Sequence, residues 1–364
     1  MKNFITFILP THNEERNIIP LIKEILELNI NYEIEIIVVD DDSVDQTQVL
    51  VKKLSKIERR VRLINRIGRY GLSSAINEGC LNSTGEIIAI MDSDGQHEVK
   101  SVYEAIDLLI NGNYDLIIGS RFLEKSSIKG LSAKRKDGSS YANILARNTL
   151  SKEYRDITDY MSGCFVFKTI SCMEEIKKID VNGFKFLYEL LALTKGKLKI
   201  KEIPLQFKSR KFGYSKLDIA VIWDFVISLI HTFINRVIPR KAISFGVVGS
   251  IGVLVHLAMV YFLISITSLS FIQVLPFAGV SAASSNFLIN NMFTFRNKRL
   301  RGIGLFYGLL KFLMVSSIPL VANVGLAASY YTFISPNTFI SQMAGIVVVF
   351  IWNYVASSKF VWKE

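Results

Sequence analysis

The sequence predicts an α/β domain with a mostly parallel sheet, followed by an all-α domain of four transmembrane helices. Short apolar segments alternate with helical patterns in the first part of the chain, as they do in βα units. Charged residues make up 21% of the chain, yet none lies between Ala242 and Phe295. Between Gly302 and Ser358 the sole charged residue is Lys311. This division of charge separates a water-soluble domain from a membrane domain.

The first repeats carry the strand and helix signals in order. Residues 4–9 form a short apolar segment that ends at Pro10, which is typical of a buried strand. Residues 14–28 carry a helical stripe of apolar side chains, and residues 34–39 again have the pattern of a strand. The same alternation predicts strands at 62–65, 87–91 and 115–118 and helices at 72–81 and 99–110.

Polar clusters follow the predicted strands. In a sheet built from βα units the parallel strands end at one edge, and ligands bind beyond that edge. The clusters are Thr11-His12-Asn13-Glu14, Asp40-Asp41-Asp42, Asp92-Ser93-Asp94 and Ser120-Arg121. We therefore expect the active site at this common edge.

A membrane region follows the sheet. Residues 217–235 are apolar on one side but carry Asp218, Asp224 and His231, which predicts an amphipathic helix on the membrane surface. A buried helix of the soluble domain is the alternative. Four spans come next, each long enough to cross a hydrocarbon layer about 30 Å thick: 243–265, 271–294, 307–330 and 339–358. The predicted domains are 1–216, 217–241 and 242–364.

Basic residues indicate the orientation in the membrane. The loop between the second and third spans contains Arg296, Lys298, Arg299 and Arg301, whereas loops 266–270 and 331–338 carry no charge. The positive-inside rule places the basic loop and both termini in the cytoplasm. The N-terminus has no signal-peptide pattern, so the first domain is expected to stay in the cytosol. The formal net charge of +11 then reflects membrane topology and anionic lipids rather than nucleic acid.

Asp92, Asp94 and Gln96 occupy alternate positions after a predicted strand. Two carboxylates and an amide supply the oxygen ligands that Mg²⁺ or Mn²⁺ prefers, and such a cation would neutralise charge on a departing nucleotide. A solvated turn is the alternative for an isolated Asp-x-Asp. The three cysteines have the spacing of neither a zinc site nor a disulfide framework. The predicted cofactor is therefore a divalent cation on oxygen ligands.

Three consecutive carboxylates, Asp40, Asp41 and Asp42, end an earlier predicted strand. Carboxylates this close repel one another unless cations or hydrogen-bond donors compensate. A nucleoside offers such donors in its base edge and ribose hydroxyls, so the cluster predicts nucleoside recognition. A charged loop that caps the next helix is the alternative, and the two roles are compatible.

Taken together, these motifs resemble a family 2 glycosyltransferase of GT-A fold, in particular the branch of dolichol- or polyprenyl-phosphate mannose synthases. The resemblance rests on residues 10–14, 38–47 and 91–97, with further matches at Gly119-Ser120-Arg121, Asp159-Tyr160-Met161-Ser162-Gly163, Gly183-Phe184-Lys185 and 207–216. Residues 245–249 and 290–295 resemble GtrA-like membrane domains. His12 and Cys164 depart from the family pattern, which usually has tyrosine and an aromatic residue there.

The resemblance implies roles for individual residues. It implies catalytic roles for Asp94, Arg121 and Arg210, and metal binding by Asp92, Asp94 and Gln96. The donor-binding residues that it implies are Pro10, His12, Glu14, Val39, Asp40, Asp42, Asp92 and Ser93. Those implied for the acceptor phosphate are Arg135, Ser139, Arg210 and Lys216. A phosphate nucleophile is already anionic, so such an enzyme needs alignment and charge management rather than a strong general base.

The leading hypothesis is inverting transfer of a hexose, mannose from GDP-mannose, to a polyprenyl or dolichyl phosphate at the cytoplasmic membrane face. Transfer of glucose from a UDP-sugar is the alternative within the same class. A lipid-linked sugar flippase or membrane interaction protein is the alternative from another class. The expected partners are the nucleotide sugar, the lipid phosphate and membrane lipids, without nucleic acid. The protein is expected to be a multi-pass membrane protein, and a homo-oligomer is compatible with the sequence.

Overall fold

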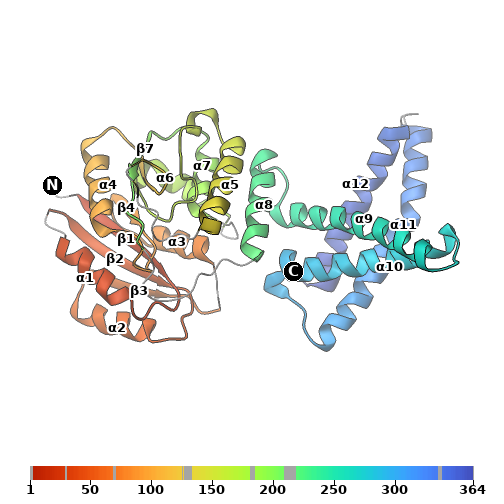
Figure 1. Cartoon of the computed structure of the whole chain (residues 1–364), viewed down its shortest axis with the longest axis horizontal. Helices are drawn as coiled ribbons and strands as arrows, with labels where there is room; N and C mark the ends of the chain where they lie inside the picture. The colour runs from red at the N-terminus through yellow and green to blue at the C-terminus, as the bar shows by residue number, and fades with distance from the viewer. Residues whose placement is uncertain are drawn as a thin grey trace. The chain divides into compact units, whose positions relative to one another are not determined.

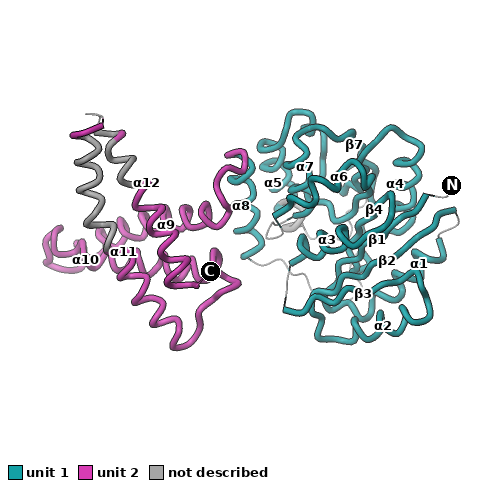
Figure 2. The backbone as a smooth tube through the Cα atoms, turned by 180° about the vertical axis from the view of Figure 1, so that it is seen from behind, with its two compact units in different colours: residues 1–233 teal, residues 234–364 magenta. Residues whose placement is uncertain are grey.

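The structure is a computed structural model that describes residues 3–28, 31–68, 71–124, 126, 133–180, 185–208, 219–334 and 338–363. The side chains of residues 133–137, 318–331, 338–339 and 341–346 are not described. The chain forms two compact units, Met1–Phe233 and Ile234–Glu364, drawn in teal and magenta in Figure 2. Each unit is considered by itself.

The described part of the first unit contains a seven-stranded sheet in the order β3-β2-β1-β4-β6-β5-β7. The strands are β1 (Phe4–Thr11), β2 (Glu33–Asp40), β3 (Val61–Asn65), β4 (Ile87–Ile90), β5 (Leu116–Ser120), β6 (Phe165–Lys168) and β7 (Ile200–Pro204). All pairings are parallel except those of β6, which runs antiparallel to both β4 and β5. The expected α/β fold with a mostly parallel sheet is confirmed.

Helices cover both faces of the sheet, as Figure 1 shows. One face packs on α1 (Ile18–Leu28), α2 (Thr47–Ile57) and α4 (Val99–Asn111). The other face packs on α3 (Leu72–Leu81), α5 (Ala133–Thr149), α6 (Thr169–Ile176), α7 (Phe186–Thr194) and α8 (Ile219–Phe233). Strand periodicity produces this division: on β1, Ile5, Phe7 and Leu9 enter the first core and Ile8 enters the second.

Helix α8 belongs to the first unit, and the boundary between the units falls after Phe233. Phe225 of α8 lies in the core with Tyr188 of α7, and their ring centroids are 6.3 Å apart. The opposite face of α8 exposes the apolar side chains of Ile219, Ile222, Val226 and Phe233. The expected domain boundary at residue 216 lies outside the described residues.

The second unit is helical. Its elements are α9 (Arg240–Ile266), α10 (Phe271–Ile289), η2 (Asn290–Thr294), η3 (Arg296–Lys298), α11 (Ile303–Phe333), α12 (Thr338–Ala356) and η4 (Ser357–Val361). In the described part of the chain, α9 and the segment Phe271–Thr294 are long and apolar enough to cross a membrane. Helix α9 packs on α10, and α11 packs on α12.

The two helical pairs of the second unit end alike. Each second helix finishes in a π-helical turn, closed by Phe295 N donating to Asn290 O at 2.8 Å and by Trp362 N donating to Ser357 O at 3.2 Å. The aromatic residues that follow these turns, Phe295 and Trp362, stack with centroids 4.1 Å apart. The two ends are therefore joined through equivalent positions.

Candidate active site

The carboxyl ends of the parallel strands bring the polar clusters to one edge of the sheet. Thr11 at the end of β1 pairs with Asp40 at the end of β2, and β4 lies on the other side of β1. Strand β6 runs antiparallel, so its beginning reaches the same edge, where Gly119 N donates to Cys164 O at 2.9 Å. Residues after β1, β2, β4 and β5 and before β6 therefore converge, as predicted for a site at this edge.

The loops after β1 and β2 are held together by reciprocal hydrogen bonds. His12 Nδ1 lies 2.8 Å from Asp41 O, and Asn13 N donates to Ser43 Oγ at 2.8 Å. Val44 N donates to Asn13 Oδ1 at 2.9 Å. Asn13 has a φ of 56°, a left-handed conformation that asparagine tolerates better than most residues. The predicted donor-binding loops thus form one rigid surface.

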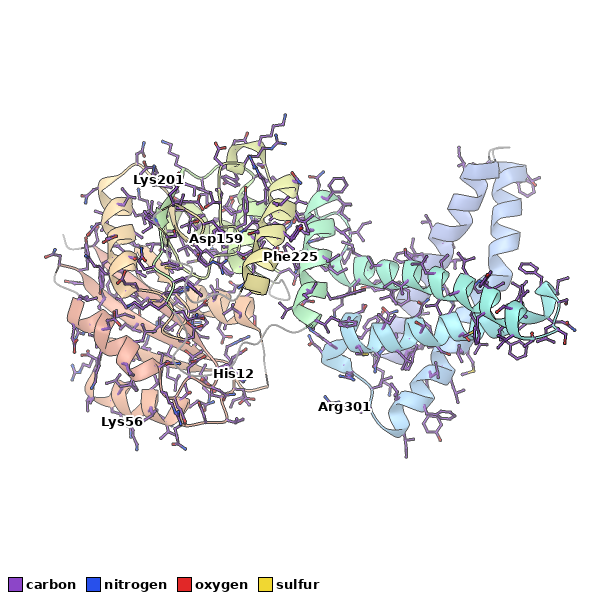
Figure 3. All side chains as sticks on the ribbon, in the orientation of Figure 1. His12, Lys56, Asp159, Lys201, Phe225 and Arg301 are labelled. Atoms are coloured by element: carbon purple, nitrogen blue, oxygen red, sulfur yellow. The ribbon has the colours of Figure 1, made fainter. Side chains whose placement is uncertain are left out.

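Several predicted donor-binding residues are buried in this surface. Pro10 and Val39 lie in the sheet, and Ser93 Oγ donates to Pro10 O at 2.7 Å. Glu14 is 8% exposed, and its backbone N donates to Thr47 Oγ1 at 2.9 Å. These residues are buried, whereas His12, labelled in Figure 3, is partly exposed.

The neighbouring carboxylates of Asp40 and Asp42 are used differently. Asp40 is fully buried, and its oxygens accept hydrogen bonds from Ser43 N at 2.9 Å, Ser43 Oγ at 2.5 Å and Gln48 Nε2 at 2.7 Å. Asp42 is half-buried, has a φ of 60°, and accepts from Gly68 N at 3.3 Å. Asp40 therefore holds the loop in shape, whereas Asp42 is partly exposed.

Arg66, which was not predicted from the sequence, holds this loop in place through ion pairs. Arg66 follows β3, is 2% exposed, and forms ion pairs with Asp41 and with Glu78, the latter at 3.1 Å. Asp41 Oδ2 also accepts from Gly71 N at 2.7 Å. Burial raises the pKa of Asp41, although Gly71 and Arg66 oppose that shift. The signal that could have identified Arg66 is its position directly after the strand predicted at 62–65.

The predicted metal ligands lie in a tight turn after β4. Asp94 is 7% exposed, and its Oδ1 accepts from Gln96 N at 3.0 Å. Gln96 Nε2 donates to Lys208 O at 3.0 Å, so the nitrogen end of this amide is bound to the backbone and the oxygen is the atom that could bind a cation. Among the described residues there is no group of three or more His, Cys, Asp and Glu that could hold a metal. The donor set of two carboxylates and one amide fits a hard divalent cation.

Asp92 is held from two sides. His97 accepts from Asp92 N through Nδ1 at 3.2 Å, and its ring lies 5.5 Å from that of Phe207. On the other side, a Cβ built on Gly163 would lie 2.3 Å from Asp92 Oδ2. Glycine is required at position 163 because any side chain would displace the Asp92 carboxylate.

Arg121 forms a side-on ion pair with Asp159, a residue that sequence reasoning quoted without a role. Arg121 Nε donates to Asp159 Oδ2 at 2.7 Å and Nη2 donates to Oδ1 at 2.8 Å. Asp159 is fully buried (Figure 3). Nη2 also lies 3.4 Å from Ser139 Oγ, so these two predicted residues are neighbours. With this edge of the guanidinium directed at Asp159, a phosphate would meet Arg121 through Nη1.

Lys185 at the start of α7 joins the charges of the site. Burial lowers its pKa, while attraction from Asp92, Asp159 and Asp94 acts in the opposite direction. Lys185 ends the segment Gly183-Phe184-Lys185, which resembles the family, but no pattern in the sequence indicated its role. A cation among three carboxylates lowers their mutual repulsion.

Other predicted acceptor residues are not placed by the structure. Arg210 and Lys216 lie outside the described residues. Arg135 belongs to α5, but its side chain is not described. Their roles stay predictions.

Comparison with known proteins matches two families along the chain. Residues 6–174 match Glycosyl transferase family 2, and residues 244–362 match the GtrA/DPMS transmembrane domain. A dolichol-phosphate mannosyltransferase from Pyrococcus furiosus is 31% identical over 361 residues, which cover 98% of this chain and 99% of that protein. A protein of the same name from Mycosarcoma maydis is 31% identical over 258 residues, 69% of this chain and 83% of that protein.

Solved structures also match the first part of the chain. Glucosyl-3-phosphoglycerate synthase from Mycobacterium tuberculosis, in complex with Mn²⁺, uridine diphosphate and glucosyl-3-phosphoglycerate, is 17% identical. The match covers 64% of this chain and 80% of that one, with a TM-score of 0.46.

Proposed function

This chain belongs to glycosyl transferase family 2 and carries a GtrA/DPMS transmembrane domain, and on that premise we propose that it transfers mannose from GDP-mannose to a polyprenyl or dolichyl phosphate. As a family member it is a glycosyltransferase with a membrane domain. The proposal adds the donor, the lipid acceptor, inversion at the anomeric carbon and the cytoplasmic membrane face. The two relatives named dolichol-phosphate mannosyltransferase support the choice of sugar and lipid.

One observation carries the proposal: the carboxylates of Asp92 and Asp94 share a sheet edge with the buried Arg121–Asp159 ion pair. Carboxylates that can hold a cation, together with a guanidinium at the same sheet edge, suit a reaction in which one phosphate leaves and another attacks. The rigid loops after β1 and β2 supply the adjoining surface for a nucleoside, with Asp42 the carboxylate at its rim.

The reaction is a single displacement. An oxygen of the lipid phosphate forms a bond to the anomeric carbon while the bond from that carbon to the nucleoside diphosphate breaks, which inverts the configuration. The bond electrons leave with the diphosphate, and no proton needs to be removed from the nucleophile. Correct alignment alone can contribute about 7–11 kcal/mol to such a step.

The residues of this chain divide the work of binding. Asp92, Asp94 and Gln96 would hold the divalent cation, which when bound supplies positive charge to the donor diphosphate. Mg²⁺ and Mn²⁺ both suit this ligand set. On the acceptor side, we assign the neighbouring side chains of Arg121 and Ser139 to the phosphate, with Arg135, Arg210 and Lys216 as the predicted further cations.

The second unit supports the proposed orientation. Asn291 Nδ2 donates to Leu300 O at 3.1 Å, and Asn291 Oδ1 accepts from Leu300 N at 2.8 Å and from Trp362 Nε1 at 3.1 Å. One amide thus holds the basic loop and the C-terminal segment at the same end of the membrane domain. Because basic loops stay in the cytoplasm, we place both segments there.

The test is transfer by the purified full chain in lipid nanodiscs, with a panel of GDP- and UDP-sugars and polyprenyl phosphate. We expect GDP-mannose to be the best donor and the product to be a β-linked mannosyl lipid. Preference for UDP-glucose would establish the glucosyltransferase alternative. Absence of transfer with every donor, together with movement of a lipid-linked sugar across vesicles, would establish the flippase alternative.

A further inference from the structure

The carboxylate of Glu202 holds the backbone that carries Asp159. Glu202 lies on β7 and pairs with Ile118 of β5, the strand that leads to Arg121. Its Oε2 accepts from Thr158 N at 2.9 Å, and its Oε1 accepts from Asp159 N at 3.1 Å and Thr158 Oγ1 at 3.1 Å. The two backbone donors belong to consecutive peptide groups, so this carboxylate orients the backbone on both sides of Thr158.

The segment around Asp159 depends on such side chains because it has no regular structure of its own. It lies between the short η1 helix (Lys152–Tyr154) and β6, outside the hydrogen-bond ladder of the sheet. Buried backbone N–H groups there need other acceptors. Tyr160 N donates to Asn143 Oδ1 at 3.0 Å. The backbone N–H groups of Thr158 and Asp159 both donate to Glu202.

Asp159 in turn orients the side chain of Arg121. Besides the side-on ion pair, Asp159 Oδ2 accepts from the backbone N of Arg121 at 3.2 Å. We propose that Glu202 is a positioning residue, which orients Asp159 and through it the guanidinium of Arg121 for contact with the acceptor phosphate. The inference rests on the proposed function, because it concerns the Arg121 contact that this function requires.

Substitution by glutamine tests this role with little change of shape. Glu202→Gln replaces one acceptor oxygen by an NH₂ group, and either orientation of that amide sets it against Thr158 N or Asp159 N. One of these two peptide N–H groups therefore loses its acceptor. Burial raises the pKa of Glu202 in spite of the Thr158 and Asp159 hydrogen bonds. The folded state therefore disfavours the charged form of Glu202 at neutral pH, which offsets part of the stability lost with that hydrogen bond, so we expect a small change in the melting temperature.

Glu35 of β2 offers a matched control. Its Oε1 also accepts from one backbone N and two threonine hydroxyls, namely Thr84 N at 2.8 Å, Thr84 Oγ1 at 2.8 Å and Thr6 Oγ1 at 2.7 Å. It lies toward the opposite edge of the sheet from Asp40. Although burial alone would raise it, hydrogen bonds from Thr6 and Thr84 lower the pKa of Glu35, so its charge stabilises the fold at neutral pH. Glu35→Gln should lower the melting temperature and leave turnover unchanged.

The experiment is a double-mutant cycle on the full chain in nanodiscs. We expect Glu202→Gln to lower kcat/KM for the lipid phosphate about tenfold. Donor binding by calorimetry should stay unchanged. In an Arg121→Lys background, which keeps a charge but not the fork, the same substitution should change kcat/KM by less than about twofold, because coupled residues are not additive.

Two results would overturn the inference. One is unchanged kcat/KM in Glu202→Gln. The other is a full additional loss in the Arg121→Lys background, which would mean that Glu202 acts independently of Arg121. Failure of the proposed function is a separate outcome, seen as absence of lipid glycosylation by the unaltered protein with every donor.

Discussion

The hydrogen bonds of Arg121 limit which of its N–H groups can contact the proposed acceptor phosphate. Its Nε and Nη2 are directed at Asp159, so the paired N–H groups that grip a phosphate side-on are occupied inside the protein. If Arg121 contacts the lipid phosphate as proposed, we expect a second guanidinium to supply the side-on contact. Arg210, predicted on the acceptor side, follows β7 closely in the sequence and precedes α8.

Arg210→Ala should lower kcat/KM for the lipid phosphate by about tenfold or more, because a charge-assisted contact contributes about 1.5–3 kcal/mol. Arg210→Lys should rescue this only in part, since lysine restores the charge without the fork. Kinetics with varied lipid phosphate measure the loss, and calorimetry with nucleotide sugar should give unchanged binding. Loss of donor binding with intact lipid kinetics would assign Arg210 to the donor site and leave Arg135 as the next candidate.

The residues in the turn after β4 lead us to expect that activity depends on a divalent cation. Asp94→Ala should lower turnover by about 100-fold or more, as removal of one transition-state charge partner does. Chelation should inactivate the unaltered protein, and added Mg²⁺ or Mn²⁺ should restore it. Mn²⁺ binding by calorimetry provides a readout without turnover, and Glu104→Gln on the exposed face of α4 is the control. Near-normal turnover of Asp94→Ala in metal-replete buffer would remove the metal assignment.

Among the helices, α8 has two faces with different partners. Its Phe225 face packs into the core of the first unit (Figure 3), whereas Ile219, Ile222, Val226 and Phe233 are exposed. The sequence allowed two interpretations of this helix, an amphipathic helix on the membrane surface and a buried helix of the first domain. The structure is compatible with both, because one face packs on the first unit and the other is apolar and exposed. Full burial of one such side chain contributes about 1.5–3 kcal/mol, so we expect the exposed face to bind the membrane.

A fluorophore at position 222 tests this contact. In a cysteine-free variant in nanodiscs, the label on Ile222→Cys should show blue-shifted emission and quenching by lipid-soluble quenchers. The control is Lys56→Cys on α2, which is exposed and lies elsewhere on the unit (Figure 3). Equal emission at the two positions would show that the α8 face is in water.

The membrane domain as a whole has one basic end. Asn291 joins the loop at Leu300 to Trp362, and the stacked Phe295 and Trp362 rings join the ends of the two helical pairs. Arg296, Lys298, Arg299 and Arg301 therefore lie at the same end of this unit as the C-terminal segment. This arrangement agrees with the charge asymmetry of the sequence.

Labelling from outside intact cells tests the orientation. In a variant without Cys80, Cys164 and Cys172, a membrane-impermeant reagent should modify Ile334→Cys and leave Arg299→Cys unmodified until the cells are opened. The native cysteines are buried, so their replacement by alanine or serine should leave the surface unchanged. The reverse pattern would invert the topology and place the donor site outside the cytosol.

Local patterns were sufficient to predict the fold class. The strands expected at 34–39 and 87–91 and the helices expected at 72–81 and 99–110 correspond to β2, β4, α3 and α4. The division of charge likewise predicted the helical second part. Both signals are periodic or compositional, so neighbouring residues carry them. The antiparallel β6 gave no comparable signal, because its orientation depends on pairing with β4 and β5 rather than on its own residues.

The sequence by itself determined which polar residues reach the functional edge, because residues that end parallel strands meet there whatever lies between them. Only the tertiary structure decided how these residues are used. It buries Asp40, directs Arg121 at Asp159, sets Glu202 beneath Asp159 and joins Gln96 to Lys208 across 112 residues of sequence. Such contacts satisfy buried polar groups from distant segments, and no local period encodes which distant group will be the partner.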